Sequence, residues 1–257
     1  MRGLSIIIAA VIACPALAQE ACHFAPMGTV TAVAVRDSRT LLLSDGRELR
    51  LAAVELSDDS RAPLERLLLG RPLKLEGASA EPDRYGRLVA FAFAGDGQPS
   101  AQQVLVSEGV ARVAARVGNK ACADALLAAE RAARASNKGL WSNPNFALLP
   151  PENLTRLRAE RGHFAIIEGK VLSVRVSGST TYVNFGRRWT RDFSVIIPRR
   201  NQRIFNAAGL EPSKLEGRSI RVRGWLEQRR GPIIEVDAPE QIEITDQTMS
   251  DARETRQ

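Results

Sequence analysis

Residues 40–51 read Thr-Leu-Leu-Leu-Ser-Asp-Gly-Arg-Glu-Leu-Arg-Leu, and this stretch decides the fold. Asp45 and Gly46 stand at the centre of a hairpin turn, because Asp-Gly readily adopts the positive φ angles that tight turns between antiparallel strands require. The runs on either side of the turn are strand-like. The stretch therefore predicts a hairpin with strands at residues 40–44 and 48–54.

Strand and helix signals surround this hairpin in a definite order. Residues 28–35 alternate loosely and are rich in Val, Thr and Ala, which indicates a strand before the hairpin. Residues 60–69 have apolar residues at helical spacing and end at Gly70, a helix-stop signal. Two further strands are expected at 72–76 and 88–94, with a polar loop at 81–87, and helices at 102–108 and 121–136. This order predicts a mainly β domain with added helices, namely an OB-type five-stranded barrel.

The second half of the chain repeats the order. Residues 142–162 form a predicted linker with Asn-Pro and Pro-Pro, and residues 246–257 a polar, disordered tail. Strands are expected at residues 164–176, 180–185, 193–198, 219–226 and 233–236 with 241–244, and a short helix at 201–208. The sequence thus predicts a signal peptide at 1–18, a first domain at 19–141 and a second, OB-like β domain at 163–245.

The N-terminus and the overall charge bear on location and partners. An apolar run too short to span a membrane leads to Ala16-Leu17-Ala18, which indicates a secretory signal peptide and an exported protein, periplasmic or secreted. Residues 11–14 also loosely fit a lipoprotein signal, so a lipid anchor at Cys14 is the alternative. No other segment is long and apolar enough to cross a membrane. The net charge of +7 favours nucleic acid or another polyanion as partner, against the alternative of a solubility surface. The sequence does not indicate an oligomeric state.

Two cysteines remain after the predicted cleavage. Cys22 and Cys122 form an even pair in an oxidising compartment, which predicts a disulfide between them, the alternative being two free buried thiols.

Four segments, in register, resemble the staphylococcal nuclease (thermonuclease) family over residues 28–141. They are Val35-Arg36-Asp37-Ser38-Arg39-Thr40-Leu41, the run from Leu49 to Asp58, Asp83-Arg84-Tyr85-Gly86-Arg87, and a helical end that closes with Gly139-Leu140-Trp141. The resemblance implies an OB-type barrel that cleaves phosphodiesters of DNA or RNA, commonly with calcium. In such enzymes carboxylates hold the dication and arginines stabilise charge on the phosphate.

The resemblance assigns roles to particular residues. Arg50 and Arg87 correspond to the family's phosphate-clamping arginines, Tyr85 lies in the same phosphate-binding segment, and Asp58 stands at the general-base position with a side chain one methylene shorter. Glu55 corresponds to one metal carboxylate, and Asp37 is a second, weaker candidate.

Arg39 stands at the second acidic position of the turn, where the family needs a carboxylate. A cation at this position opposes metal binding.

Two functions follow. One is a nuclease with a degenerate metal site and weak or lost catalysis, using calcium if active and otherwise no cofactor. The alternative is a non-catalytic envelope module in which Arg39, Arg50 and Arg87 bind nucleic acid, another polyanion or a protein partner.

A second surface is suggested by a run that mixes aromatics with arginines. Residues 160–230 hold 15 Lys and Arg against 6 Asp and Glu. Within them, Tyr182, Arg187, Arg188, Trp189 and Arg191 resemble the aromatic-plus-arginine pattern with which OB barrels bind single strands. The alternative is that Tyr182, Phe185 and Trp189 belong to a core or hairpin and that the arginines are a solvated face.

Overall fold

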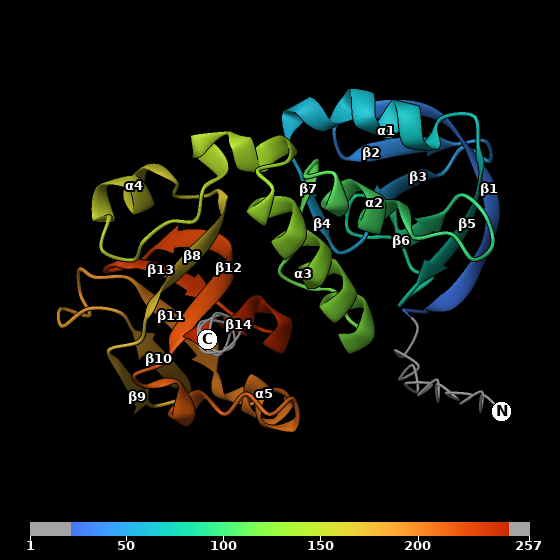
Figure 1. Cartoon of the computed structure of the whole chain (residues 1–257). Coiled ribbons are helices and arrows are strands. Elements are labelled where there is room, and N and C mark those ends of the chain that lie inside the picture. Colours follow the sequence, from blue (N-terminus) through green and yellow to red (C-terminus); the bar gives the residue numbers. More distant parts are fainter. Residues whose placement is uncertain (1–21, 247–257) are drawn as a thin grey trace, which may run out of the picture.

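The computed structural model describes residues 22–246. The predicted signal peptide, Cys14 as the alternative site of a lipid anchor, and residues 247–257 of the predicted tail lie outside the described residues. Strands make up more of the described chain than helices do, and they are arranged as two units with a long helix between them (Figure 1). None of the helices between residues 22 and 246 is long and apolar enough to cross a membrane.

The first unit is a closed five-stranded barrel, as predicted. Its strands pair in the order β1-β2-β3-β6-β5, and β5 closes on β1. The bounds are β1 (Ala25–Asp37), β2 (Thr40–Leu43), β3 (Glu48–Leu51), β5 (Pro72–Gly77) and β6 (Leu88–Phe93). β3 and β6 run parallel and the other pairs antiparallel. In the predicted hairpin, Gly46 has φ +85° and donates its N–H to the Leu43 carbonyl at 3.0 Å, which turns β2 into β3.

The strand predicted over residues 48–54 is wrong in its second half. β3 ends at Leu51, and Ala53 has φ +61°, a left-handed conformation that no strand continues through. After this turn β4 (Val54–Leu56) leaves the barrel and pairs with β7 (Ala111–Val113), so that Glu55 lies opposite Arg112.

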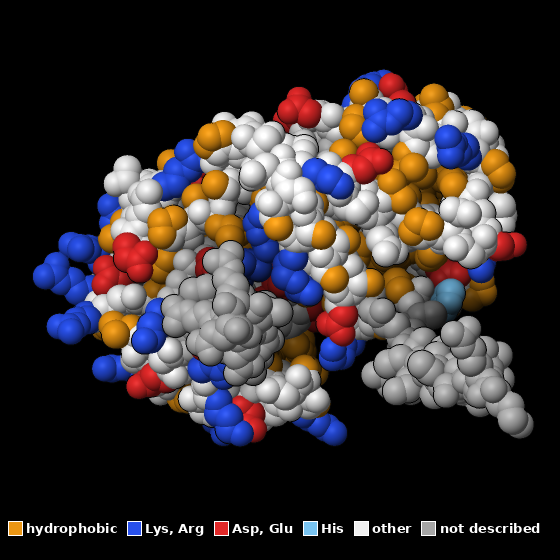
Figure 2. All heavy atoms as spheres, viewed as in Figure 1, with side chains coloured by type: hydrophobic (Ala, Val, Ile, Leu, Met, Phe, Trp, Pro, Cys, Tyr) orange, Lys and Arg blue, Asp and Glu red, His pale blue; other side chains and the backbone are white. Residues whose placement is uncertain are grey.

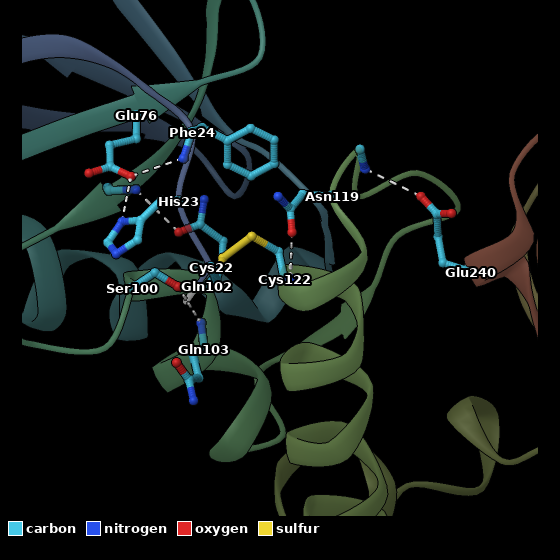
Figure 3. The surroundings of a disulfide bond; sticks show 12 residues. Cys22, His23, Phe24, Glu76, Ser100, Gln102, Gln103, Asn119, Cys122 and Glu240 are labelled. Atoms are coloured by element: carbon cyan, nitrogen blue, oxygen red, sulfur yellow. Dashed lines mark hydrogen bonds and ion pairs between the residues drawn. A yellow bond between two sulfur atoms is a disulfide. The ribbon is translucent and has the colours of Figure 1, made fainter. Parts of the chain in front are cut away.

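Helices cover this barrel where the apolar spacing predicts them. They are a 3₁₀ turn, η1 (Asp58–Ser60), followed by α1 (Arg61–Leu68), α2 (Ala101–Ser107) and α3 (Lys120–Ala135). α3 buries Cys122, Leu126 and Leu127 in the same hydrophobic core as the barrel strands. Cys122 forms a disulfide with Cys22, with Cα atoms 4.5 Å apart, which ties the chain before β1 to the first turn of α3 (Figure 3).

The second unit repeats the pairing order of the first. Its strands are β8 (Phe164–Lys170), β9 (Ser173–Ser177), β10 (Thr180–Asn184), β11 (Ser194–Pro198), β12 (Ser219–Gln228), β13 (Pro232–Glu235) and β14 (Ile242–Ile244). The strand expected over residues 164–176 is bent into β8 and β9, and β8 pairs with β12 while β9 pairs with β10. β11 and β13 are parallel, as β3 and β6 are, and the bent β8–β9 segment pairs with β12 and β10 as β1 pairs with β5 and β2. This sheet is therefore barrel-like, and the second unit is called the second barrel from here on.

The segment between the two units is packed rather than extended. It contains η2 (Gly139–Ser142), η3 (Pro144–Phe146) and α4 (Leu154–Ala159). Leu149 and Leu157 belong to the hydrophobic core of the second unit, and Leu149 bridges to Ile167 of β8. The helix α5 (Gln202–Ala207) connects β11 to β12 and buries Phe205 in the same core.

Buried charges join the two units across α3, which lies between them in Figure 1. Arg223 of β12 has no exposed surface, and its guanidinium donates to both carboxylate oxygens of Glu130 on α3, at 3.1 and 2.9 Å. The same guanidinium donates to Glu243 of β14 at 2.6 Å and to the Val113 carbonyl at 3.2 Å. Arg223 therefore bridges α3, β7 and β14.

Candidate anion-binding site

Four segments of the first unit position the residues that the sequence singled out. Arg39 precedes β2, Arg50 lies on β3, Glu55 lies on β4, and Arg87 immediately precedes β6. The parallel pairing of β3 with β6 places Arg50 opposite Val89, two residues after Arg87.

In the turn between β1 and β2, Asp37 and Arg39 have different roles. The Asp37 carboxylate accepts the backbone N–H of Arg39 at 2.7 Å, which is the hydrogen bond of an Asx turn. The Arg39 side chain is exposed, and among residues 22–246 its guanidinium has no hydrogen-bond or ion-pair partner. The turn thus uses the carboxylate internally and presents an unpaired cation.

Glu55 is a buried carboxyl group surrounded by arginines. It is 7% exposed, and the nearest cation is Arg50, whose guanidinium nitrogen lies 3.6 Å from a carboxylate oxygen. Burial raises the pKa of Glu55, while the positive charges of Arg50, Arg39 and Arg112 act against this without reversing it. Arg39 is therefore close enough for its charge to influence Glu55 directly.

Arg87 is oriented by a loop carboxylate. Asp83 accepts two hydrogen bonds from the Arg87 guanidinium, at 3.1 and 2.8 Å, and also the backbone N–H groups of Tyr85 and Arg87. Burial alone would raise the pKa of Asp83, but these hydrogen bonds lower it overall. Arg87 also reaches the Thr40 hydroxyl at 3.4 Å, which brings it to the start of β2 beside Arg39.

Tyr85 and Asp58 are solvent-facing. Tyr85 is 64% exposed, and the guanidinium carbons of Arg84 and Arg87 lie 4.8 and 5.1 Å from its ring centroid. Asp58 is exposed at the start of η1, and its carboxylate has no hydrogen-bond or ion-pair partner within the described part of the chain. The structure therefore places Arg50 against Glu55, brings the charge of Arg39 close enough to act on Glu55, and holds Arg87 at Thr40, the neighbour of Arg39 in the chain.

The donor groups do not fit a calcium ion. Calcium takes six to eight oxygen ligands, several of them from carboxylates. Among the described residues no group of three or more Asp, Glu, His or Cys side chains stands close enough to hold a metal. Of the two predicted ligands, Glu55 faces arginines and has a pKa raised by burial, and the Asp37 carboxylate accepts a hydrogen bond within its own turn.

Sequence reasoning missed a cavity beside this site. It has a volume of about 550 Å³ and is lined by Arg50 and Glu55 from the first barrel and by Trp225, Glu227 and Glu235 from the second. These two sets of residues lie far apart in the chain, and no local sequence signal links them.

Of the residues predicted for the second surface, some are exposed in the structure and others are buried or half-buried. Phe185 is buried in the second core, as the alternative interpretation had it, and Tyr182 is half-buried. Trp189, in contrast, is 57% exposed, and it lines a pocket of about 280 Å³ together with Arg187 and Arg175. Arg188 and Arg191 are exposed, and Arg191 pairs with Asp192 at 3.5 Å.

One known family matches part of the chain. Residues 49–143 match the family model of staphylococcal nuclease homologues. No curated protein matches the chain. The matched range contains Arg50, Glu55, Asp58 and Arg87, and it begins after the turn that holds Asp37 and Arg39. Together with the closed five-stranded barrel, the match identifies residues 49–143 as a staphylococcal-nuclease-like segment.

Proposed function

We propose that this chain is an exported nuclease-like protein that binds a phosphate group of nucleic acid through Arg39, Arg50 and Arg87, with weak or lost hydrolysis. The observation that carries the proposal is the charge balance of the site. Three arginines, at positions 39, 50 and 112, act on the one buried carboxyl group of Glu55, whose pKa is raised. Such a site attracts an anion and repels a dication.

Each arginine has a distinct state in the site. Arg39 is unpaired and free to form two parallel hydrogen bonds with a phosphate. Arg50 is held loosely, 3.6 Å from Glu55, and can turn toward a phosphate without breaking a short hydrogen bond. Arg87 is fixed in direction by Asp83, so it presents the side of its guanidinium that faces Thr40. The three together clamp one phosphate.

The same residues account for weak catalysis. Hydrolysis needs an activated water molecule, and Asp58 is the remaining candidate base. Asp58 is exposed and has no hydrogen-bond or ion-pair partner in the described chain to position it, and an arginine cannot lower the pKa of a water molecule as a bound dication does. The arginines would still stabilise charge on the phosphate, which gives binding and at most slow cleavage.

The test combines cleavage and binding with matched variants of the full mature chain. Cleavage of denatured DNA is measured with calcium and with chelator for the wild type and Arg39→Asp. Oligonucleotide binding is measured over a range of salt concentrations for the wild type, Arg39→Ala and Arg36→Ala. Arg36 is the matched control, because it is an exposed arginine near the same turn that is already paired with Glu48 at 3.2 Å.

We expect no rapid calcium-dependent cleavage by the wild type. We also expect about tenfold weaker binding by Arg39→Ala with a smaller salt dependence, and little change in Arg36→Ala. Cleavage gained by Arg39→Asp with calcium would support the assignment of position 39 to a lost metal site. Calcium-dependent cleavage by the wild type, or equal binding by Arg39→Ala and Arg36→Ala, would overturn the proposal.

A further inference from the structure

We propose that the second barrel carries a separate binding surface for single-stranded nucleic acid, centred on Trp189. This Trp189 surface consists of Leu172, Arg175, Arg187, Trp189 and Arg230. It belongs to the bend between β8 and β9, to β9, to the loop between β10 and β11, and to the loop between β12 and β13. It therefore shares no residue with the arginine site of the first barrel.

The exposure of Trp189 is built into the fold. The loop of residues 185–193 is anchored at both ends, because Phe185 and Phe193 are buried in the second core with ring centroids 5.2 Å apart. Trp189 lies between these anchors and remains 57% exposed. The two buried phenylalanines fix the ends of the loop, and the indole at its middle lies in solvent, where it is available to a ligand.

Two close backbone approaches shape the surface. A Cβ atom at Gly186 would overlap the side chain of Asp192, and one at Gly231 would lie 2.7 Å from the Asp192 carbonyl oxygen. The Asp192 carboxylate also accepts the Arg188 N–H at 2.9 Å, so it organises the loop from within. The two loops can therefore meet, and the Arg230 guanidinium carbon lies 5.0 Å from the Trp189 ring centroid.

The cations around Trp189 are not neutralised. Arg175, Arg187 and Arg230 have no ion-pair partner among residues 22–246, whereas Arg221 and Arg223 of the same barrel pair with glutamates. The pocket beside Trp189 is lined by Leu172, Ser173, Asn184 and Gly186 besides its arginines and the indole, and by no acidic residue. Figure 2 shows Lys and Arg side chains gathered along the left edge of the second barrel. This charge favours an anionic ligand.

An aromatic platform among unpaired arginines matches single-stranded nucleic acid more closely than other polyanions. Arg230 covers one face of the Trp189 ring, and the exposed remainder offers a π-surface on which an unpaired base can stack. Arg175 and Arg187 stand beside it, where the phosphates of the same strand would pass. A polyanion without bases would bind to the arginines but would have no group to stack on the indole.

The surface differs from the one the sequence suggested. Arg175 lies opposite Tyr182 in the β9–β10 pair, and Arg230 comes from the β12–β13 turn, so neither is near Trp189 in the sequence. Tyr182 is half-buried, and Arg191 is paired with Asp192. The proposed surface therefore retains Trp189 and Arg187 and gains Arg175 and Arg230.

The test measures binding of a fluorescein-labelled oligothymidylate to the mature chain by anisotropy, and quenching of tryptophan fluorescence by an unlabelled one. The variants are Trp189→Ala, Trp189→Phe, the double variant Arg175→Ala/Arg187→Ala and the double control Arg199→Ala/Arg203→Ala. The control removes two exposed arginines of the same barrel that lack ion-pair partners in the described chain and follow the opposite end of β11. Polyphosphate serves as a competitor without bases.

We expect Trp189→Ala to weaken binding about tenfold and Trp189→Phe to restore much of it. The part of the quenching that comes from Trp189, taken as the difference from the wild type, should disappear in both variants, while any quenching of Trp225 beside the first site remains. The double variant Arg175→Ala/Arg187→Ala should weaken binding more than the control Arg199→Ala/Arg203→Ala does. It should also reduce the dependence of the binding affinity on salt. Three outcomes would overturn the proposal. They are an unchanged affinity in Trp189→Ala, equal losses of affinity in the two double arginine variants, and displacement of the oligonucleotide by polyphosphate that is as effective as displacement by unlabelled oligonucleotide. Arg39→Ala leaves the quenching of Trp189 intact if this surface is separate, so the two sites can fail independently.

Discussion

Replacement of Glu130 by alanine tests whether buried charge holds the two barrels together. Glu130 and Arg223 have no exposed surface, and the Glu130 carboxylate accepts two hydrogen bonds from Arg223 and one from the Val113 backbone N–H at 2.8 Å. In Glu130→Ala, Arg223 stays buried with Glu243 as its remaining carboxylate, and the Val113 N–H loses its acceptor.

The expected loss of stability is large. Removing one member of a buried ion pair costs about 3–5 kcal/mol, because the partner charge stays in a medium that solvates it poorly. For a protein of this size that corresponds to a fall in melting temperature of about 6–20 °C. The measurement is urea unfolding at neutral pH, followed by circular dichroism and by tryptophan fluorescence.

Arg131→Ala is the matched control. Arg131 also lies on α3 and binds Glu243 at 2.9 Å, but its side chain is 47% exposed. Its loss should cost less than about 1 kcal/mol, as for other exposed ion pairs. Equal losses in Glu130→Ala and Arg131→Ala would refute the reasoning. The double variant Glu130→Leu/Arg223→Met should be more stable than Glu130→Ala, because the buried guanidinium of Arg223 is removed together with the Glu130 carboxylate that binds it.

Two further predictions concern the first barrel. Because the pKa of Glu55 is raised above its ordinary 4.5, its ionised form costs stability above the folded-state pKa, so Glu55→Gln should raise the free energy of unfolding at pH 8. That gain should vanish below about pH 4, where the carboxyl is protonated in both states; a gain independent of pH in urea unfolding would contradict it. The double variant Cys22→Ser/Cys122→Ser should have a free energy of unfolding lower by about 4 kcal/mol, because the disulfide closes a loop of 100 residues. An unchanged melting temperature would show that the disulfide does not stabilise the fold.

Local signals in the sequence predicted much of the first barrel. Asp45 and Gly46 define the β2–β3 turn because their effect on the backbone acts within two residues. The helical spacing over residues 121–136 matches α3 to within one residue at each end, since one face of it is buried. The break at Ala53 was missed, because alanine carries no signal for a positive φ that tertiary packing imposes.

The state of each charge could not be predicted, because it depends on partners distant in the chain. Arg187 and Arg223 both lie in the arginine-rich second half, and the sequence alone does not distinguish their roles. Arg223 is buried against Glu130, 93 residues away, while Arg187 has no ion-pair partner within the described chain. Residue counts show how many charges a segment carries. Only the fold shows which arginines are buried in ion pairs and which are available to a ligand.

The same dependence on surroundings limits what a single substitution at position 39 can restore. Arg39 now lowers the pKa of Glu55, in part offsetting burial. Replacing it with aspartate removes that cation and adds a like charge, and both changes raise the pKa of Glu55 further. A dication held between the introduced carboxylate and Glu55 would have to displace a proton, so its affinity would rise with pH. Calcium-dependent cleavage by Arg39→Asp should therefore rise with pH, and cleavage independent of pH would mean that Glu55 does not take part.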